Sequence, residues 1–261
     1  MSTWIALSKK DHLEKYWKPR EGFAFTKEMQ VVPIAISELS KLLPHYCIAF
    51  VKEGDAYQAV VLLGLGEQRN VYLNSENKWL ATYVPENLRP YPFILGNTED
   101  DDNKILCISD SHLGEEGEHR LFDPNGELTK ETAEILELLN QRDLHNEANR
   151  NACKRLDDAG LIVDWELTVE TPDTADEFKI RGLFKLDEQK LNQLESTVFA
   201  KLRDSGALLL AYGHLFSLSQ IDQISQRIEY ARKVKSVAKS EDLEDIFSDG
   251  GTLNLDALNF D

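Results

Sequence analysis

Short apolar runs recur through the first half of the chain, and turn-forming residues separate them. Six runs stand out: YCIAFV (46–51), YQAVVLLGL (57–65), NVYLN (70–74), RPYPFILG (89–96), KILCIS (104–109) and HRLFD (119–123). They are rich in β-branched and aromatic residues, and closely spaced runs of this kind are typical of antiparallel strands. The pattern predicts a mostly antiparallel sheet, either a curled sheet or a partial barrel.

Helical spacing of apolar residues appears once within this sheet-rich part and then dominates after Thr129. ISELSKLL (36–43) places its apolar residues on one face, and a proline follows it. From residue 129 the apolar residues again fall at helical spacing, and Gly160 suits a helix end. The step from Leu139 to Leu144 breaks the spacing, which leaves open whether this stretch forms one helix or two.

Strand and helix patterns alternate in the rest of the second half. LIVDWELTVE (161–170) and EFKIRGLFKL (177–186) predict an antiparallel pair of strands. Asp187 is placed to cap a helix over the next nineteen residues, and Ser219 is placed to cap the last helix. ALLLAYG (207–213) is compatible with a buried strand and with a short helix.

These patterns predict an α+β fold in three parts. The tight-turn signal DPNG (123–126) marks the boundary between the first two. We expect a sheet-rich half over 1–128, a helix-rich half with a small sheet over 129–239, and an acidic tail over 240–261. Acidic residues alternate with Leu, Ile and Phe in the tail, which fits a disordered segment that docks on a partner and equally a segment packed on its own domain.

The net charge of −17 is concentrated in two stretches. Residues 97–127 hold ten acidic and two basic residues, and residues 241–261 hold seven acidic residues and no Lys or Arg. Nucleic acids and anionic membrane surfaces are poor partners for such a chain, because binding them needs a concentrated cationic face. A basic protein or peptide is a compatible partner.

Cysteine usage and apolar run lengths indicate where the protein works. The three cysteines are far apart and form no CxxC motif, so we expect free thiols in a reducing compartment. The first ten residues lack the order of a secretory signal, and the longest apolar runs are far shorter than a membrane span. We therefore expect a cytoplasmic protein with no membrane span.

An ordered set of motifs runs from residue 12 to residue 228. VVPIAISEL leads into YCIAFV, and LLGLGEQRNVYLNSENKWLATYVPENLRPYPF is the most specific block. LCISD, LFDPNGE, LDDAGLI, RGLFKLDEQKLNQL and AYGHLFSLSQIDQI follow in order. In order and spacing this set resembles the bacterial SapC family over most of the chain, with the acidic tail outside the resemblance.

The resemblance implies a setting rather than a reaction. Genes for members of the family often lie beside genes for flavin-dependent tryptophan halogenases, cupin-like or JmjC-like proteins and TonB-dependent receptors. This setting implies a binding or accessory role in a peptide or amino-acid modification or uptake system. The implied partner is a protein or peptide, with a flavin-dependent halogenase as one candidate. The family supplies no catalytic residue, and we expect no catalytic residue, no metal and no cofactor.

The candidate ligand site is the stretch rich in aromatic residues and proline around residue 90. It comprises Trp79, Tyr83, Arg89, Tyr91 and Phe93. Aromatic rings give large contact areas, and arginine offers a planar donor for carboxylates, so this set can line a pocket for a peptide or a small aromatic ligand. The alternative is that the rings only pack around the rigid turn that the neighbouring prolines impose.

Patterns for catalysis are weaker. The GLG at 64–66 lacks the third glycine and the following helix of a nucleotide site. His112 and His119 near Asp110 have residue types that bind ferrous iron, but solvated loop histidines explain them as well. His214 stands near a helix and could act as a general base, although no nucleophile motif accompanies it.

We therefore expect a non-catalytic binding or accessory protein. The first alternative is an iron-dependent oxygenase-like enzyme that uses the histidines. The second is a surface-layer-associated structural protein, against which the missing export signal argues.

Overall fold

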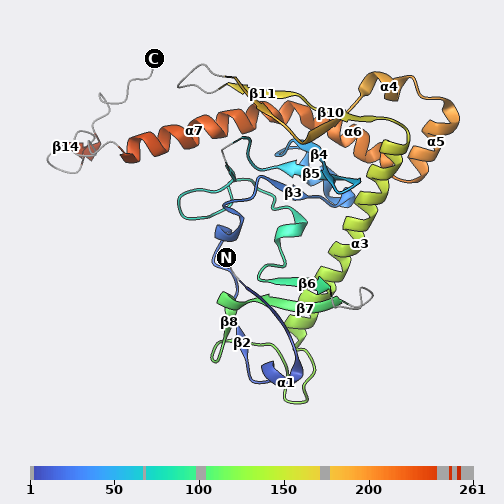
Figure 1. The fold of residues 1–261 in the computed structure, drawn as a ribbon. Coiled ribbons are helices and arrows are strands. Elements are labelled where there is room, and N and C mark those ends of the chain that lie inside the picture. Colours follow the sequence, from blue (N-terminus) through green and yellow to red (C-terminus); the bar gives the residue numbers. More distant parts are fainter. Residues whose placement is uncertain are drawn as a thin grey trace.

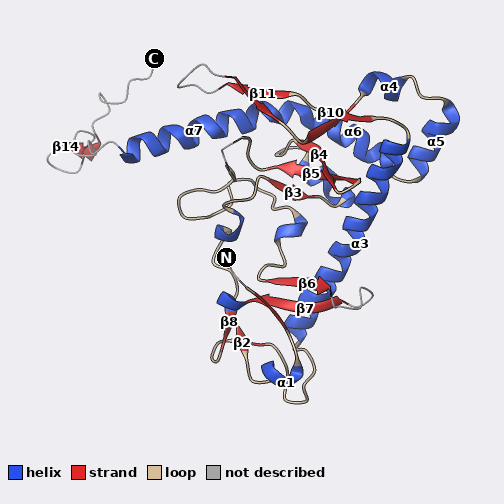
Figure 2. Cartoon of the chain, in the orientation of Figure 1, coloured by secondary structure: helices blue, strands red, loops and turns tan. Residues whose placement is uncertain are grey.

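The computed structural model describes residues 3–66, 69–97, 104–170 and 177–239, together with short strands at 247–248 and 252–253. Figure 1 shows a long helix, α3, that runs beside an upper and a lower group of strands. Figure 2 shows most of the other helices gathered around the upper group. Helices and antiparallel strands both contribute, so the predicted α+β class is confirmed.

A five-stranded antiparallel sheet forms the upper group, which we call the central sheet. Its order is β10-β13-β4-β5-β3. The strands are β3 (Val31–Pro33), β4 (Ile48–Glu53), β5 (Ala56–Leu62), β10 (Ile162–Asp164) and β13 (Leu183–Leu186). β4 and β5 form a hairpin that pairs Glu53 with Ala56, and Gly54 in its tight loop has a φ of 60°. Glycine adopts this φ without strain, which explains its place in the predicted turn.

Strands from both sides of residue 128 build the central sheet. β13 pairs with β4 through Leu183 and Val51, and β10 pairs with β13 through Ile162 and Leu186. The predicted pairing of the two late strands is confirmed, but each strand is divided. Their outer parts, β11 (Leu167–Glu170) and β12 (Glu177–Ile180), form a separate two-stranded ribbon. The division of the chain at residue 128 stays a prediction.

The helices settle several alternatives. They are α1 (Lys9–His12), α2 (Leu39–Leu42), α3 (Lys130–Asp158), α4 (Glu188–Asn192), α5 (Ser196–Asp204), α6 (Ala207–Ser217) and α7 (Ile221–Lys239). α3 is one helix: Leu139 is buried, whereas Leu144 is 66% exposed, so the break in apolar spacing only marks a change of face. The helix predicted after Asp187 is instead two, and ALLLAYG is helical.

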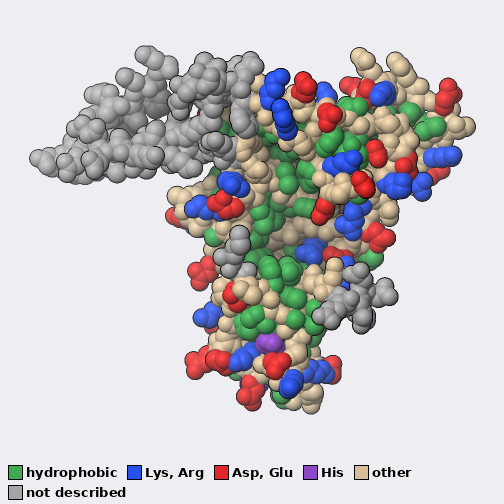
Figure 3. Space-filling view, in the orientation of Figure 1, with side chains coloured by type: hydrophobic (Ala, Val, Ile, Leu, Met, Phe, Trp, Pro, Cys, Tyr) green, Lys and Arg blue, Asp and Glu red, His purple; other side chains and the backbone are tan. Residues whose placement is uncertain are grey.

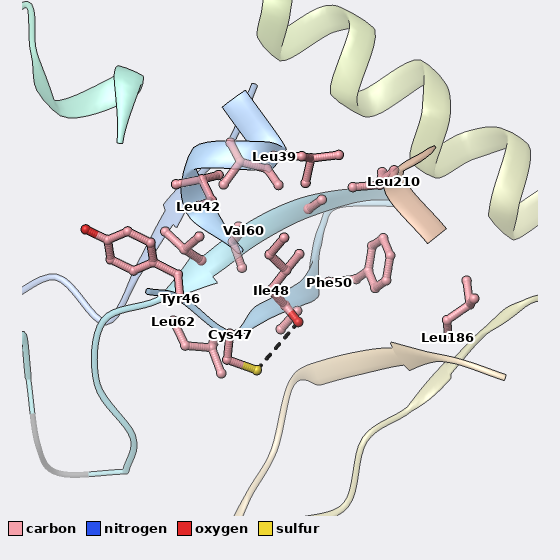
Figure 4. Close-up of a cluster of buried hydrophobic side chains, with 14 of the residues drawn as sticks. Leu39, Leu42, Tyr46, Cys47, Ile48, Phe50, Val60, Leu62, Leu186 and Leu210 are labelled. Carbon is pink, nitrogen blue, oxygen red and sulfur yellow. Dashed lines mark hydrogen bonds between the residues drawn. The ribbon is translucent and has the colours of Figure 1, made fainter. Parts of the chain in front are cut away.

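The main hydrophobic cluster lies between the central sheet and helices α2, α3 and α6. Figure 4 shows Leu39 and Leu42 of α2 and Leu210 of α6 around the side chains of Ile48 and Phe50 on β4. Each of these five side chains is buried. Full burial of one such side chain stabilises the fold by roughly 1.5–3 kcal/mol, so this cluster is the principal source of stability.

The lower group of strands forms two small sheets, with orders β1-β7-β6 and β8-β2-β9. The strands are β1 (Trp4–Ala6), β2 (Tyr16–Trp17), β6 (Phe93–Asn97), β7 (Lys104–Ser109), β8 (Leu113–Gly114) and β9 (His119–Arg120). A second hydrophobic cluster lies between them and α3, and it contains Trp17, Phe93 and Ile108. Figure 3 shows charged side chains on both the upper and the lower part of one face, with apolar side chains reaching the surface between them.

The stretch 70–74, predicted to be a strand, is a loop, and that prediction is wrong. Leu73 makes a single bridge with Trp79 and no ladder. Asn70 accepts a hydrogen bond from the Tyr72 N–H at 2.9 Å and donates one to Thr26 Oγ1 at 2.8 Å. These side-chain bonds offer the backbone an alternative to strand pairing.

Helix α3 joins the two hydrophobic clusters. Leu136 and Leu139 in its first half pack in the second cluster, and Cys153 and Leu156 near its end pack in the main cluster. Among the described residues, no helix has the length and apolar content that crossing a membrane requires. The last two strands, β14 (Phe247–Ser248) and β15 (Thr252–Leu253), pair with each other inside the predicted tail.

Candidate ligand-binding site

A cavity of about 360 Å³ lies against the first half of α3. Three segments line it: Trp17 at the end of β2 with Pro19 and Arg20 after it; Arg89, Pro90, Tyr91 and Pro92 before β6; and Ile135 and Leu138 on α3. Cavities that bind small molecules commonly have roughly 300–1,000 Å³. This volume is therefore suited to a ligand the size of one amino acid rather than to a long peptide.

The segment that enters the cavity is held by a short 3-10 helix, η3 (Glu86–Leu88). The Glu86 N–H donates to Glu38 Oε2 at 2.9 Å, and the Glu86 carboxylate pairs with His145 of α3 at 2.7 Å. Asn87 Nδ2 donates to the carbonyl of the last residue of β3 at 2.9 Å. Arg89 follows directly, so its backbone is fixed from both the sheet and the helix.

Two arginines line the cavity, and an aromatic ring holds the guanidinium group of each. Arg20 lies 4.0 Å from the ring centroid of Phe23 and donates one hydrogen bond, from Nη1 to Gly22 O at 3.4 Å. Arg89 lies 4.7 Å from the ring centroid of Tyr83, and its Nε and Nη2 donate to one backbone carbonyl at 3.1 and 2.9 Å. A cation–π contact fixes the orientation of a guanidinium. It leaves the N–H groups free to donate hydrogen bonds within the plane of the guanidinium.

Some arginines of the described chain form an ion pair with a carboxylate, and others do not. Arg69, Arg142 and Arg203 each form one, whereas Arg20 and Arg89 form none within the described ranges. Burial lowers the pKa of Arg20, because removing a cation from water disfavours its charged form. The cavity wall therefore holds positive charge that an anionic ligand would balance.

The remaining wall is aromatic and apolar. Trp17 packs against Phe93 with ring centroids 5.0 Å apart, and Tyr91 stacks on Phe25 at 3.8 Å with an interplanar angle of 3°. The indole N–H of Trp17 is buried, and no acceptor for it exists among the described residues. This nitrogen has almost no accessible surface, so Trp17 offers the cavity its ring rather than a donor.

The structure brings some of the predicted site residues together and separates others. Arg89 and Tyr91 line the cavity, and Tyr83 lies beside it under the Arg89 guanidinium. Trp79 lies elsewhere, where its indole N–H donates to a buried tyrosine hydroxyl at 2.7 Å. Phe93 is buried in the second cluster. A ligand role for Trp79, Tyr83 and Phe93 stays a prediction.

Sequence reasoning missed half of the cavity wall. Trp17 and Arg20 stand some 70 residues before Arg89, and Ile135 and Leu138 stand some 45 residues after it. A local signal exists only in the first segment, where WKPR places a proline and an arginine two and three positions after an aromatic strand end. On α3 the two apolar residues look like any other part of a helix face.

His214 has a structural role that excludes the general-base alternative. Its Nδ1 contacts Ile48 O at 2.9 Å, and its Nε2 accepts from the Leu186 N–H at 3.2 Å. Burial lowers the pKa of His214 to about 4, so the ring is neutral near pH 7. Both ring nitrogens are occupied by backbone groups of β4 and β13, and neither is left to move a substrate proton.

The loop histidines do not converge on a metal site. His112 Nδ1 contacts Lys18 O at 2.8 Å, and His119 Nδ1 contacts the Glu131 carboxylate at 2.6 Å. In the described part of the chain, no three His, Cys, Asp or Glu side chains gather as metal ligands would. The iron-dependent alternative therefore gains no geometric support there.

The cysteines are placed as core residues. All three are free and buried. Burial raises the pKa of the Cys47 thiol to about 12 and that of the Cys153 thiol to about 12. Because the thiolate is the nucleophile, thiols with such pKa values are unreactive near neutral pH.

A second cavity, of about 330 Å³, lies where the late strands leave the central sheet. Its charged lining residues are Asp164, Glu166, Lys179 and Arg181. Charges of both signs balance here, so this cavity offers a ligand no net charge, unlike the cavity beside α3.

Comparison with known proteins identifies one family. The sequence model of the SapC family matches residues 7–224. Neither a curated protein nor a solved structure matches the chain. All residues that line the cavity beside α3, from Trp17 to Leu138, lie inside the matched range.

Proposed function

Because this chain belongs to the SapC family, we propose that it is a non-catalytic binding protein that serves a bacterial peptide or amino-acid modification or uptake system. The observation that supports binding is the cavity beside α3, which aromatic residues and two arginines line. The side chains that would commonly act as base or nucleophile support it too. His214 and the cysteines are buried and held by the core rather than presented to a cavity.

The size and lining of the cavity favour a small ligand from such a system. Amino acids and the ends of peptides combine an apolar side chain with polar groups at close spacing. A cavity of about 360 Å³ with apolar, aromatic and cationic lining offers contacts to both kinds of group. The protein would present or retain this ligand for an enzyme that modifies it.

The binding function is tested by filling the cavity. Wild-type protein and the variant Leu138→Trp are titrated with a panel of free amino acids, their N-acetyl derivatives and di- and tripeptides, followed by calorimetry. We expect saturable binding of at least one panel member to wild type and its loss in Leu138→Trp, because the indole occupies the ligand volume. Leu144→Trp is the matched control, since Leu144 is exposed on the same helix.

Two results would end the proposal. One is that no panel member binds wild-type protein. The other is that Leu138→Trp binds as well as Leu144→Trp does, which would place the ligand outside this cavity. Circular dichroism of both variants establishes that each keeps its helices.

The partner is the second part of the proposal. We infer a cytoplasmic protein or peptide partner, with a flavin-dependent halogenase as the candidate that the family's setting implies, and with the acidic tail as the docking element. The test uses a purified halogenase from the same genome. Its retention is compared on the immobilised intact chain and on an immobilised chain that ends at Lys239. Retention by the intact chain alone supports tail-dependent docking. Retention by neither chain removes the halogenase as partner.

A further inference from the structure

We propose that the cavity beside α3 recognises a free carboxylate carried on an apolar or aromatic body. In this arrangement Arg20 and Arg89 bind the carboxylate, and Trp17, Tyr91 and Leu138 contact the body. The inference rests on the proposed binding function and names its ligand class. It separates a free amino-acid or peptide terminus from an amide or an internal peptide segment, neither of which carries the charge.

The first argument is electrostatic. The chain has 46 acidic residues and a net charge of −17, so carboxylate partners for arginine are abundant. Arg69, Arg142 and Arg203 use them, whereas the two arginines of the cavity pair with none in the described part of the chain. Other arginines there also lack a carboxylate, but most of them, such as Arg150 and Arg155, are exposed to water. Arg20 and Arg89 are half-buried beside the same hollow, where an anion from outside would replace the water that their charges have lost.

Reach and geometry form the second argument. A guanidinium has five N–H donors in a rigid plane that matches the two oxygens of a carboxylate. Arg20 uses one hydrogen bond on the protein, and both bonds of Arg89 go to the single carbonyl of Val84. Most donors therefore remain for a ligand. The ring faces of Phe23 and Tyr83 hold the two groups in place beforehand, which lowers the entropy lost on binding.

The third argument concerns the neutral part of the ligand. Proline rings, Trp17, Tyr91, Ile135 and Leu138 make the rest of the lining apolar. A bare inorganic anion would leave this surface without a contact, whereas an aromatic or branched side chain would cover it. Trp17 contributes apolar ring surface to the same wall.

The probes for the test are N-acetyl-phenylalanine and N-acetyl-phenylalaninamide. They have nearly the same shape and differ in the charge of one group. Calorimetry on the intact wild-type chain should show the acid binding at least about tenfold more tightly than the amide, since hydrogen bonds to a charged group are the stronger ones. The tripeptide Ala-Ala-Phe with a free C-terminus and its C-terminal amide distinguish a peptide end from a free amino acid as the source of the carboxylate.

Variants assign the effect to the two arginines. Arg20→Met and Arg89→Met should each weaken binding of the acid by about 10- to 100-fold and leave binding of the amide unchanged. Arg203→Met is the matched control, because Arg203 is exposed and paired with its neighbour Asp204. Arg89→Lys keeps the charge but loses the planar fork, and should fall between wild type and Arg89→Met.

The outcomes separate this inference from the function on which it rests. Equal affinity for acid and amide overturns carboxylate recognition while the cavity remains a binding site. The inference is also overturned if none of the N-acetyl acids of Phe, Trp, Leu and Pro binds at concentrations up to about 10 mM. A dissociation constant above this value is too weak for specific recognition. The binding function itself is decided by the comparison of Leu138→Trp with Leu144→Trp. If Arg89→Met does not fold, carboxylate recognition is still tested by two measurements. These are the affinity of Arg20→Met for the acid and the ratio of the affinities of wild type for the acid and the amide.

Discussion

Two polar side chains buried beside the central sheet, Asn149 and His214, bind backbone groups of its strands. Asn149 of α3 donates to Ile34 O at 2.7 Å and to Ala59 O at 2.9 Å, and it accepts from the Ala59 N–H at 2.9 Å. His214 joins Ile48 O to the Leu186 N–H. Each side chain closes a gap beside a strand, so it acts as part of the sheet.

The donors around the cavity differ in that the protein does not use most of them. Arg20 makes one hydrogen bond, and Arg89 directs both of its hydrogen bonds to one carbonyl. A guanidinium has five N–H donors, so most of the donors of these two side chains remain for a ligand. The contrast between the two regions teaches which polar groups hold the fold and which are available for binding.

The largest expected effect comes from removing His214. In His214→Ala, Ile48 O and the Leu186 N–H lose their partner in the core and a cavity remains, so the free energy of unfolding should fall by about 3–5 kcal/mol. Urea denaturation followed by circular dichroism measures this. Tyr212→Ala, on the exposed face of the same helix, should cost less than about 1 kcal/mol. Equal losses in the two variants would show that His214 is not a structural bridge.

The contribution of His214 to stability should also appear as a loss of stability of the wild-type protein in acid. The pKa of His214 is lowered to about 4 by burial, against about 6.5 in the unfolded chain. Between these values the unfolded chain binds the additional proton, so stability is retained above pH 6.5 and falls as the pH drops toward 4, by about 3 kcal/mol in total. Burial raises the pKa of Glu38, which has the opposite effect on stability.

The variant His214→Gln isolates the contribution of the histidine. Glutamine can both donate and accept but does not titrate, so the variant retains the Glu38 effect and loses that of His214. Urea midpoints of wild type and variant, measured from pH 7.5 to 4, should converge as the pH falls. Parallel curves would contradict a depressed pKa for His214.

Asn149 should show the next effect in size. Asn149→Ala leaves both backbone groups of Ala59 and the Ile34 carbonyl without this side-chain partner, and the free energy of unfolding should fall by about 2–4 kcal/mol. Asn151→Ala is the control, because Asn151 is exposed two positions further along α3, and it should change stability by less than about 0.5 kcal/mol. A neutral Asn149→Ala would mean that the helix is held on the sheet by apolar packing alone.

Local signals explain what the sequence could predict. The strands β4, β5 and β7 lie within apolar runs with turn residues beside them, and the ends of α3 follow from Thr129 and Gly160. ALLLAYG could not be assigned, because a segment that is apolar on nearly all sides shows no period. The run at 70–74 misled, because the side chain of Asn70 binds the backbone that a strand would have paired.

Long-range geometry explains what the sequence could not predict. Arg89 and Tyr91 were found because aromatic residues and prolines cluster around them. Arg20 and Leu138 reach the same cavity only through the packing of β2 and α3, and nothing within their own segments encodes that meeting. The partners of His214 are likewise 166 and 28 positions away from it.

The smallest effects on stability are expected for the two arginine variants, which have large expected effects on binding. Arg20→Met removes one long hydrogen bond and a half-buried cation without a carboxylate partner, so the free energy of unfolding should change by less than about 0.5 kcal/mol. Arg89→Met should cost about 1 kcal/mol, because Arg89 holds Val84 O through two donors. Urea denaturation of both variants gives the comparison. A loss of 2 kcal/mol or more, on the order of a lost buried hydrogen bond, in Arg20→Met would place this arginine with His214 and Asn149, among the residues that hold the fold.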